Sequence, residues 1–328
     1  MRIEKKLNLW LLFVLLAGCQ PVSKQSTPRN VHSPAPADTV AAPSDTRIFH
    51  LPEMPAMLTD PDRCLDYLAH HYWDCINPAD TALLQHQPEI EQAWANYCDL
   101  LRHLPLSQAQ EVIKALFPTL EKDLKVYVHF KSLAEKYLDD PNSPYRNEEF
   151  YIPILESMVE STSLSAMDKL RPRERLKLAL RNRMGTRAAD FTYKDAAGRA
   201  ETLYHTAMTD YTLIFFNEPG CPSCAAGLEV LDASAVVNKL LADHRLTLLA
   251  MYAGDEREEW LRHAPDFPPA WLNGYDENGE IRLHQVYDVR ATPSFYLLDR
   301  DRIVLLKDAT AEEVLDMLEK RVSLPRSD

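Results

Sequence analysis

Apolar residues recur at helical spacing through the first half of the chain. Between residues 48 and 184 they fall three and four positions apart, as amphipathic helices require. No glycine occurs from residue 19 to residue 184, and a folded stretch without glycine turns favours helices over strands. The pattern therefore predicts an all-helical domain over residues 48–185. Its clearest positions are Leu65, Leu68, Ala69 and Tyr72; Ile90, Ala93, Trp94, Tyr97 and Leu101; and Ala109, Val112, Ile113 and Leu116.

Local signals within this domain predict where helices begin and bend. Ser107 and Gln110 have the spacing of a capping box, in which each side chain bonds the backbone of the other residue. Pro118 suits the first turn of a following helix over residues 120–138. Pro153 lies inside another helical pattern and predicts a kink there.

The periodicity changes after Gly185, where short apolar runs bounded by turns replace the helical spacing. The expected strands are 211–216, 246–253, 294–299 and 302–306, and the expected helices are 222–243 and 310–322. Thr310 and Glu313 form a capping box at the start of the last helix. The alternation of strands and helices predicts an α/β domain over residues 186–328.

The first residues have the features of an export signal. Three basic side chains precede an uncharged run, 9–17, that is about half the ~20 residues needed to cross a bilayer. Leu16-Ala17-Gly18-Cys19 resembles the lipobox of bacterial lipoproteins, in which the cysteine receives the lipid. We therefore expect a signal peptide at 1–18 and a lipid anchor at Cys19. The alternative is an ordinary secretory signal with a chance cysteine.

Residues 19–47 are expected to form a disordered tether. From Gln20 to Arg47 the chain holds five prolines and seven Ser or Thr residues, but no Leu, Ile or Phe. Such a segment cannot bury enough apolar surface to offset the entropy of ordering. With Cys19 lipidated, we expect the folded part to be held in the cell envelope, facing the periplasm. The outer and the inner membrane both remain open as its site.

The charge and the cysteine count limit the function further. The 36 Lys and Arg residues and 49 Asp and Glu residues give a net charge of −13, which argues against nucleic acid as a partner. Six cysteines are too few for a disulfide-built fold, so each one needs its own explanation. Cys64, Cys75 and Cys98 are interpreted as small buried hydrophobic residues, although one pair could form a disulfide if a helix ended before Cys75.

The cluster His70-His71-Tyr72-Trp73-Asp74 offers a second possibility for chemistry in the helical domain. Neighbouring side chains on a helix point about 100° apart, so the two histidines do not face one metal ion. We therefore interpret the cluster as aromatic packing with exposed histidines.

The motif Cys221-Pro222-Ser223-Cys224 follows an expected strand and opens an expected helix. The two-residue spacer lets the sulfurs form a disulfide, and the helix start exposes the first sulfur to unpaired N–H groups. Cys221 is therefore the candidate nucleophile and Cys224 the candidate resolving thiol. A zinc site is an alternative, but it needs two more ligands at metal spacing. A purely structural disulfide is another, although so small a ring gains little loop entropy.

Residues 186–328 resemble the thioredoxin-like domain of the TlpA/ResA-like group, which are membrane-tethered bacterial thiol-disulfide oxidoreductases. The residues that carry the resemblance are Ala189-Asp190-Phe191, the CPSC motif and Ala291-Thr292-Pro293-Ser294-Phe295-Tyr296-Leu297-Leu298-Asp299. The resemblance implies that Pro293 is cis, faces the disulfide and shapes the substrate groove. It also implies exchange with protein thiols and disulfides, more often in the reducing direction, and a separate redox donor. We expect no cofactor and no metal. The preceding residues are similar to a helical domain of unknown function found before such domains in some bacterial lipoproteins.

The chain departs from the thioredoxin pattern near the motif. Thioredoxins usually place Trp where this chain has Gly220, and a buried acid where it has Phe215. Reducing members often carry Glu at the position of Gly227. The proton acceptor for the resolving thiol is therefore open, and the candidates are Glu218, Glu229 and water.

Two other functions compete with thiol-disulfide exchange. In the first, the protein is a non-catalytic lipoprotein that binds a partner and uses the thioredoxin fold as a scaffold. In the second, it is a peroxidase of the peroxiredoxin type. The peroxidase ranks lower, because that class has Thr three residues before its reactive Cys, where this chain has Glu218.

Overall fold

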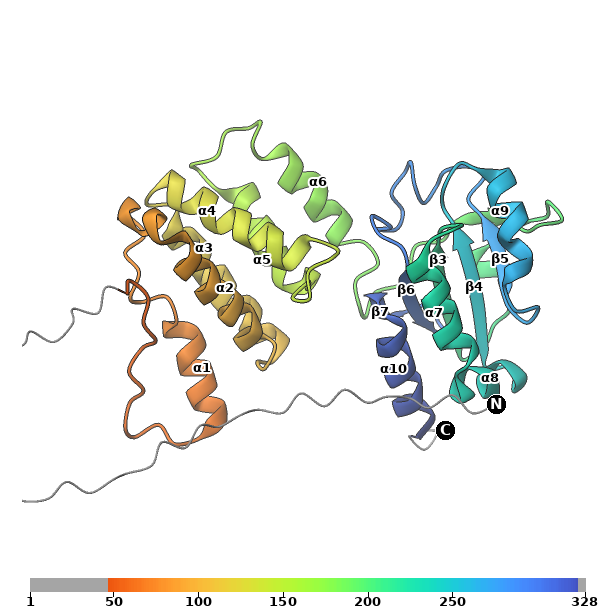
Figure 1. Cartoon of the computed structure of the whole chain (residues 1–328), viewed down its shortest axis with the longest axis horizontal. Coiled ribbons are helices and arrows are strands. Elements are labelled where there is room, and N and C mark those ends of the chain that lie inside the picture. The colour runs from red at the N-terminus through yellow and green to blue at the C-terminus, as the bar shows by residue number, and fades with distance from the viewer. Residues whose placement is uncertain (1–46, 324–328) are drawn as a thin grey trace, which may run out of the picture. The chain divides into compact units, whose positions relative to one another are not determined.

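The computed structural model describes residues 47–323. The predicted signal peptide, Cys19 and almost all of the predicted tether lie outside these residues. From Arg47 on, the chain forms one compact unit, which contains a helical half followed by an α/β half. In Figure 1 the helical half runs from orange to light green and the α/β half from green to blue.

The helical half is built from α-helices joined by short turns. Side chains cap several helix starts: Asp60 accepts from Arg63 N, Asp123 from Lys125 N and Val126 N, and Asn147 from Phe150 N. The elements are α1 (Pro61–His71), the 3-10 helix η1 (Thr81–His86), α2 (Gln87–Leu101), α3 (Leu106–Leu120), α4 (Leu124–Ala134), the π-helix η2 (Glu135–Asp139), α5 (Glu148–Glu160) and α6 (Leu170–Ala179).

Aromatic rings fill the core of the helical half. Trp94 in α2 contacts Phe117 of α3 and Phe130 of α4 edge to face, with ring centroids 6.2 Å and 5.8 Å away. Trp73, just after α1, contacts Phe130 in the same way at 5.1 Å. Such pairs add to the burial of apolar area. The predicted aromatic packing of the residues after His71 is therefore present, and His70 is exposed as expected.

Two predictions of helix starts are wrong. Pro118 lies inside the last turn of α3, where a missing N–H costs a single helical bond, and the next helix starts only where Asp123 caps it. Ser107 does not cap α3, which begins after Pro105 without a side-chain cap. Gln110 instead donates to the Glu149 carbonyl of α5, 2.8 Å away. Tertiary contacts have overridden these local signals.

The α/β half is a seven-stranded mixed sheet in the order β2-β1-β5-β4-β3-β6-β7. The central strand β3 pairs in parallel with β4 and antiparallel with β6. The elements are β1 (Thr192–Lys194), β2 (Ala200–Thr202), η3 (Leu203–His205), β3 (Tyr211–Asn217), α7 (Pro222–Asp232), α8 (Ala235–Ala242), β4 (Leu246–Tyr252), α9 (Arg257–His263), η4 (Ala264–Asp266), β5 (Leu272–Tyr275), β6 (Ser294–Asp299), β7 (Val304–Ala309) and α10 (Ala311–Ser323).

Both faces of the sheet are covered, so β3 is an apolar run instead of an alternating one. Leu213 and Phe215 belong to the cluster formed with α7, α8 and α10. Ile214 and Phe216 belong to the opposite cluster, which the residues of 188–203 and 281–287 complete. Successive side chains of a strand point to opposite faces, and here each face has an apolar layer on it.

The predicted α/β alternation is observed, with differences in detail. The expected helix 222–243 is broken into α7 and α8, because Ser234 accepts from Val237 N and starts a new helix. The Thr310 and Glu313 capping box is confirmed: each side chain bonds the other residue's N–H, at 3.2 Å and 2.9 Å. The short strands β1, β2 and β5 and the helix α9 were not predicted.

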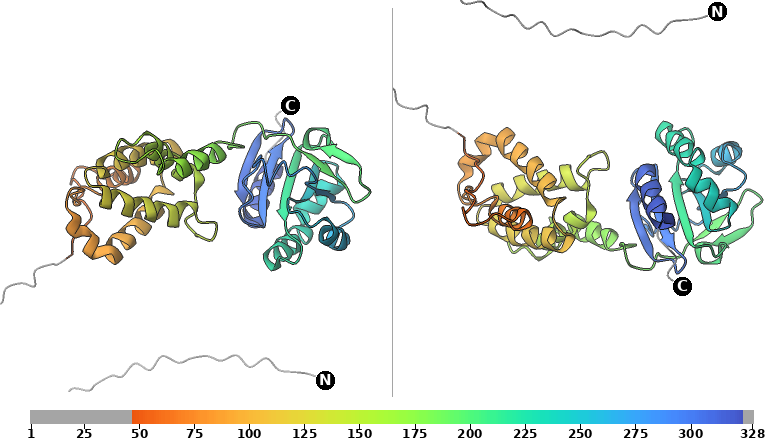
Figure 2. Two further views of the ribbon diagram at one scale, coloured as in Figure 1. Left: turned by 90° about the horizontal axis from the view of Figure 1, so that it is seen from above. Right: turned by 90° about the horizontal axis from the view of Figure 1, so that it is seen from below.

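The connection between α6 and β1 is fixed to the sheet. Gly185, in a positive-φ conformation at +79°, donates its N–H to Val304 O at 2.8 Å. Lys307 of β7 donates to Ala179 O and Arg181 O, at 2.9 Å and 2.6 Å. Figure 2 shows this connection, in light green, from two further directions.

Candidate active site

The Cys221 and Cys224 side chains lie where the central strand gives way to a helix. Strand β3 ends at Asn217, a turn with Gly220 at φ +72° follows, and Cys221 is the N-cap residue of α7. The Cys221 sulfur accepts a hydrogen bond from Cys224 N at 3.2 Å. A helix N-terminus leaves backbone N–H groups unpaired and favours negative charge. The position therefore suits a thiolate.

The two sulfurs are 2.7 Å apart, and both residues are free thiols in this structure. Cys221 is partly exposed, whereas Cys224 is buried with 5% of its surface accessible. A disulfide bond of about 2.05 Å needs only a small further approach. The pair is therefore close enough to form a disulfide.

The surroundings drive the pKa values of the two thiols apart. Partial burial raises the pKa of Cys221, but hydrogen bonds from the Cys224 thiol, the Ser223 hydroxyl and Cys224 N outweigh it, so the net shift is downward. Burial, followed by the hydrogen bond to Cys221, raises the pKa of Cys224 to about 12. Cys221 is the more readily ionised sulfur of the two.

The Thr292–Pro293 peptide is cis and lies beside the sulfur pair. Thr292 O is 3.8 Å and Thr292 Oγ1 is 4.0 Å from Cys221 Sγ. Ser223 Oγ lies 3.2 Å from Cys221 Sγ and 3.5 Å from Thr292 O. The structure thus brings together all three residues expected at the site, Cys221, Cys224 and Pro293.

The absence of Glu at position 227 has a packing explanation. A Cβ atom added to Gly227 would lie 3.2 Å from Phe295 Cζ and 3.8 Å from Pro293 Cγ. Phe295 also stacks on Phe215, with ring centroids 4.7 Å apart. The aromatic stack occupies the space beside α7, so two of the three departures from the thioredoxin pattern, Phe215 and Gly227, belong to one arrangement.

The candidate proton acceptors do not contact the buried sulfur. Glu218 and Glu229 are exposed, and no hydrogen bond found within 47–323 joins either carboxylate to Cys224. Glu218 affects the pKa of Cys224 through its backbone only, and Thr292 affects it through its hydroxyl. Water, the third candidate, therefore stays as the expected acceptor.

Thr292 and Ser223 are contacts that sequence reasoning missed. Both lie within the motifs that carry the family resemblance, but neither residue type by itself indicates a bond to sulfur. The signal that could have found them is adjacency: each is next to a residue that the motif assigns to the site.

The remaining cysteines lie apart from this site. Cys98 is buried in α2, and burial raises its pKa to about 12. Cys64 and Cys75 are half-buried, so the prediction of burial is fully met only by Cys98. Helix α1 ends before Cys75, yet Cys64 and Cys75 are free thiols, and the Cys64 thiol contacts Leu58 O at 3.2 Å.

Two findings concern metals and membranes. In the described part of the chain, no three His, Cys, Asp or Glu side chains are grouped so that they could hold a metal ion. Over the same residues, no helix has both the length and the apolar character needed to span a bilayer. Cys19, the predicted lipid anchor, lies outside this range.

Comparisons with known proteins extend over both halves. Residues 19–182 match the family described as a domain of unknown function, DUF5106. The structure is similar to that of a thioredoxin-like protein from Bacteroides caccae ATCC 43185, with 43% identity, a TM-score of 0.82, and coverage of 84% of this chain and 99% of that chain. No curated protein sequence matches the chain.

Other matches cover less than half of this chain. The C-terminal domain of an uncharacterized protein from Bacteroides fragilis NCTC 9343 is 45% identical, with a TM-score of 0.41 and coverage of 42% of this chain and 98% of that chain. A domain of a "possible thiol-disulfide isomerase" from Cytophaga hutchinsonii ATCC 33406 is 25% identical, with a TM-score of 0.38 and coverage of 44% and 95%.

Proposed function

Because this chain belongs to the DUF5106 family and is a thioredoxin-like protein, we propose that it is a thiol-disulfide oxidoreductase that exchanges disulfides with other proteins. The observation that carries the proposal is the sulfur pair at the start of α7. The outer sulfur is accessible and has a lowered pKa, while its neighbour, 2.7 Å away, is buried and has a raised one. An attacking thiol must be ionised and reachable, and a resolving thiol must be close but unreactive until needed.

The first step forms a mixed disulfide. The Cys221 thiolate attacks one sulfur of a substrate disulfide, the substrate S–S bond breaks, and the departing substrate sulfur takes up a proton. The Thr292–Pro293 loop borders the attacking sulfur and is the surface on which we expect the substrate chain to lie.

The second step releases the substrate. Cys224 loses its proton to water and attacks Cys221 Sγ, so the bond between Cys221 and the substrate breaks and the Cys221–Cys224 disulfide forms. The second substrate sulfur leaves as a thiolate and takes up a proton from water. The substrate has gained two electrons and the protein has lost two. A dithiol donor must reduce the new disulfide before another turnover, and this donor is the redox partner that the proposal requires.

We place this activity in the cell envelope. The lipobox-like residues before Cys19 support a lipid anchor, and the Pro-rich segment after it supports a tether long enough for the folded part to reorient. Disulfide exchange with exported proteins requires a compartment in which disulfides form. We propose the reducing direction by family resemblance.

Trapping experiments test the roles of the two cysteines. Cys224→Ser should accumulate mixed disulfides with envelope proteins, because the first step proceeds and the second cannot. Cys221→Ser should trap none, since the buried sulfur is neither accessible nor ionised. Equal trapping by both variants, or by neither, contradicts the proposal.

Insulin reduction with dithiothreitol separates this function from a scaffold role. The wild-type chain should accelerate precipitation of the insulin B chain, and the double variant Cys221→Ala/Cys224→Ala should not. Equal rates for the two proteins would mean that the thioredoxin fold serves binding alone.

A further inference from the structure

The loop that carries Thr292 and Pro293 is contacted by the helical half, and by the connection that follows it, at several points. We call residues 284–293 the proline loop. At its start, Arg181 Nη1 donates to His284 O at 3.0 Å and also to Gln285 O, and Asn182 Nδ2 donates to Val286 O at 2.9 Å. These donors belong to the connection that follows α6. The first residues of the loop are therefore fixed by backbone bonds.

Four charged side chains form a closed ring at the middle of the loop. Asp288 and Arg290 come from the loop, Asp139 from η2 and Arg175 from α6. Arg290 bonds Asp139 and Asp288, both at 3.0 Å, and Arg175 pairs with the same two carboxylates at 2.7 Å and 3.1 Å. Positive and negative groups alternate around the ring, so its formal charges cancel.

The ring lies largely out of water. The side chains of Asp288, Asp139 and Arg175 are 2%, 7% and 10% exposed, and that of Arg290 is 34% exposed. Burial raises the pKa of Asp139, but Arg175 and Arg290 lower it more, so the carboxylate is ionised in the folded protein. Removing one partner from a buried ring leaves another charge uncompensated, which is far costlier than losing an exposed pair.

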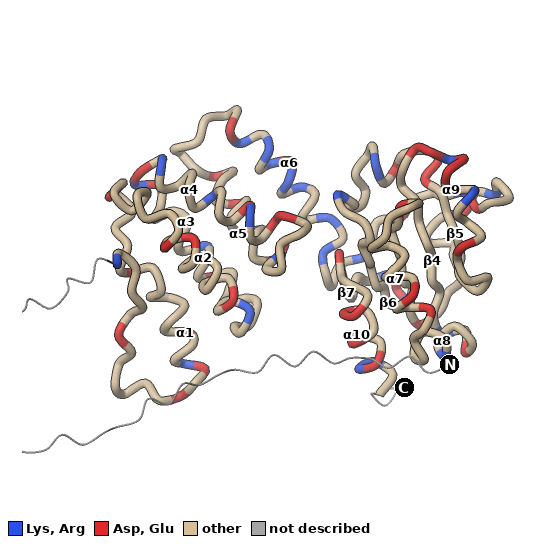
Figure 3. Tube along the Cα trace, viewed as in Figure 1, with Lys and Arg blue, Asp and Glu red and all other residues tan. Residues whose placement is uncertain are grey.

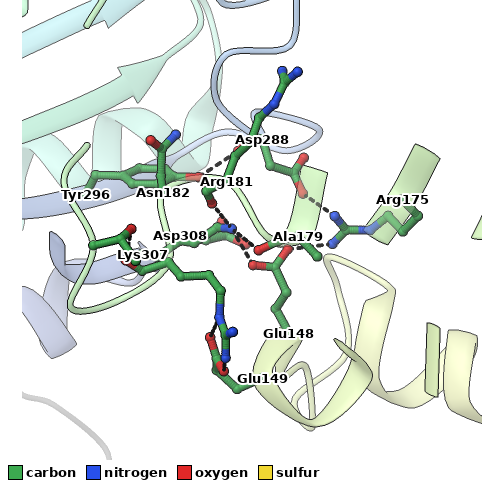
Figure 4. Close-up of polar contacts among 12 residues, drawn as sticks. Glu148, Glu149, Arg175, Ala179, Arg181, Asn182, Asp288, Tyr296, Lys307 and Asp308 are labelled. Atoms are coloured by element: carbon green, nitrogen blue, oxygen red, sulfur yellow. Dashed lines mark hydrogen bonds and ion pairs between the residues drawn. The ribbon is translucent and has the colours of Figure 1, made fainter. Parts of the chain in front are cut away.

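Figure 4 shows how the two halves meet here: Arg175 reaches across to Asp288 and also to Glu148. Figure 3 shows that α6 and the chain after it are rich in Lys and Arg. Their partners are carboxylates from η2, from α5 and from the α/β half, such as Glu149 for Arg183 and Asp288 for Arg175. Lys307 of β7 pairs in the opposite direction, with Glu148 of α5. Ion pairs therefore connect the two halves.

A separate ion pair contacts the residue that follows the proline loop, the first residue of β6. Ser294, directly after Pro293, donates its hydroxyl to Asp308 Oδ1 at 3.0 Å. Asp308, on β7, pairs in turn with Arg146 of the helical half. Arg146 lies in the segment between η2 and α5, so it is independent of the ring in sequence and in partners.

We propose that Asp139 and Arg146 are positioning residues of the redox site: through Arg290 and Asp308 the helical half clamps the proline loop on both sides of Thr292 and Pro293, and so holds Thr292 against Cys221. The inference rests on the proposed function and adds a role for the helical half. The ring partner Arg290 is two residues before Thr292, and Ser294 is two residues after it.

The clamp has a measurable consequence at the reactive sulfur. The Thr292 hydroxyl is among the groups that lower the pKa of Cys221. Release of the loop removes this contact and the bordering surface for the substrate chain. A released loop should therefore give a less ionised Cys221 and slower disulfide exchange.

The test compares the Asp139→Asn variant with the wild type, both as the full chain. The first measurement is the pH at which alkylation of reduced Cys221 reaches half its maximal rate, which we call the alkylation midpoint and follow by peptide mass spectrometry. The second measurement is the rate of insulin reduction. We expect the alkylation midpoint to rise and exchange at neutral pH to fall about three- to tenfold, within the range that mutations along coupled networks produce. The direction is diagnostic. Loss of a negative charge acting through space alone would favour the thiolate and lower the midpoint.

Glu149→Gln is the matched control. It also removes a mostly buried carboxylate that faces an arginine, Arg183, but no hydrogen bond or ion pair found for Glu149 in residues 47–323 reaches the proline loop. Its midpoint and exchange rate should equal those of wild type. A folded Asp139→Asn protein with an unchanged or lower midpoint overturns the clamp, as does an equal rise in Glu149→Gln.

Near-ultraviolet circular dichroism shows whether Asp139→Asn folds. If it does not, a second pair of variants tests the same proposal. Arg146→Gln, measured at high salt to screen through-space charge, should raise the midpoint, and Arg146→Lys should restore it. An unchanged midpoint in Arg146→Gln overturns the clamp. If the wild type exchanges no disulfides, the proposed function fails, while the alkylation comparison still decides the clamp.

Discussion

Cys98 and Cys221 show how differently the two halves treat the same side chain. Cys98 is inside α2, 1% exposed, among the aromatic residues of the helical core, and burial raises its pKa to about 12. Cys221 caps the start of α7, is partly exposed, and has a lowered pKa. One thiol is held neutral by its surroundings and the other is prepared for ionisation.

The difference comes from the position of each residue in its helix. In the middle of a helix the backbone N–H groups are already bonded to carbonyls, so a thiol finds no donor there. At the N-cap position the N–H groups are unpaired, and Cys224 N donates to the Cys221 sulfur. The ionisation of a cysteine therefore depends on its position in the helix, and the N-cap position of α7 is what distinguishes Cys221 from Cys98.

The largest expected effect is the loss of exchange in Cys221→Ser. Removing a nucleophile typically costs about three orders of magnitude or more, so insulin reduction should fall to background. Cys98→Ser should retain exchange, although a hydroxyl in an apolar core should lower the free energy of unfolding by about 1–3 kcal/mol. If Cys98→Ser abolished insulin reduction and Cys221→Ser did not, Cys98 and not Cys221 would be the reactive thiol.

The pH dependence of alkylation sharpens the comparison between the thiols. Since the pKa of Cys221 is lowered, its thiolate persists to lower pH than that of an ordinary cysteine, and it should react near neutral pH. A pKa of about 12 for Cys98 and Cys224 lies ~3.5 units above that of an ordinary cysteine, a thousandfold or greater difference in thiolate fraction. Time-resolved alkylation of the reduced protein at pH 7 measures how much faster Cys221 reacts than Cys98 and Cys224. Comparable labelling of Cys98 and Cys221 would refute it.

The reactive thiol could be predicted because its signals are local. The CPSC motif, the apolar strand before it and the Thr310–Glu313 capping box all lie within a few residues of the structure they specify. The helical and α/β fold classes followed from the change of periodicity, and the thioredoxin-like family followed from the resemblance of the CPSC motif and of residues 291–299. The similarity to the Bacteroides caccae structure, which covers 84% of this chain, confirms both.

Features that depend on distant residues could not be predicted. Asp139 and Arg290 are 151 residues apart, and a lone Asp at the end of a helix has no pattern that names its partner. Strand β2 is mostly exposed, so its residues lack the apolar run that revealed β3. Proline is common in the first turn of a helix, which is why Pro118 was expected to open one. In the structure Pro118 lies in the last turn of α3, and the next helix starts where Asp123 caps it.

A smaller effect is expected where α7 packs against the loop. Gly227→Glu restores the acid often found in reducing relatives, but its Cβ would lie 3.2 Å from Phe295 Cζ. Overpacking of this kind should cost about 1–3 kcal/mol in the free energy of unfolding, measured by urea denaturation. Ala226→Glu, at the exposed neighbouring position, is the control and should leave stability within about 0.5 kcal/mol of wild type. Equal effects would show that the space beside Phe295 is not filled.

The smallest expected effect concerns the ring that joins the two halves, and its sign follows from Asp139. Burial raises the pKa of this carboxyl, but Arg175 and Arg290 lower it overall. The unfolded chain therefore binds the proton of Asp139 more tightly than the folded protein does. The stability that the ionised Asp139 provides is complete above its unfolded pKa of about 3.9. This stability is lost as pH falls through the lower folded pKa. Asp139→Asn removes this dependence, so its unfolding free energy should fall less than that of wild type as pH drops below about 4. Asp140→Asn, at the exposed position beside it, should keep the wild-type slope. Identical slopes for all three proteins in acid denaturation would mean that the ring does not hold the halves together through ionised Asp139.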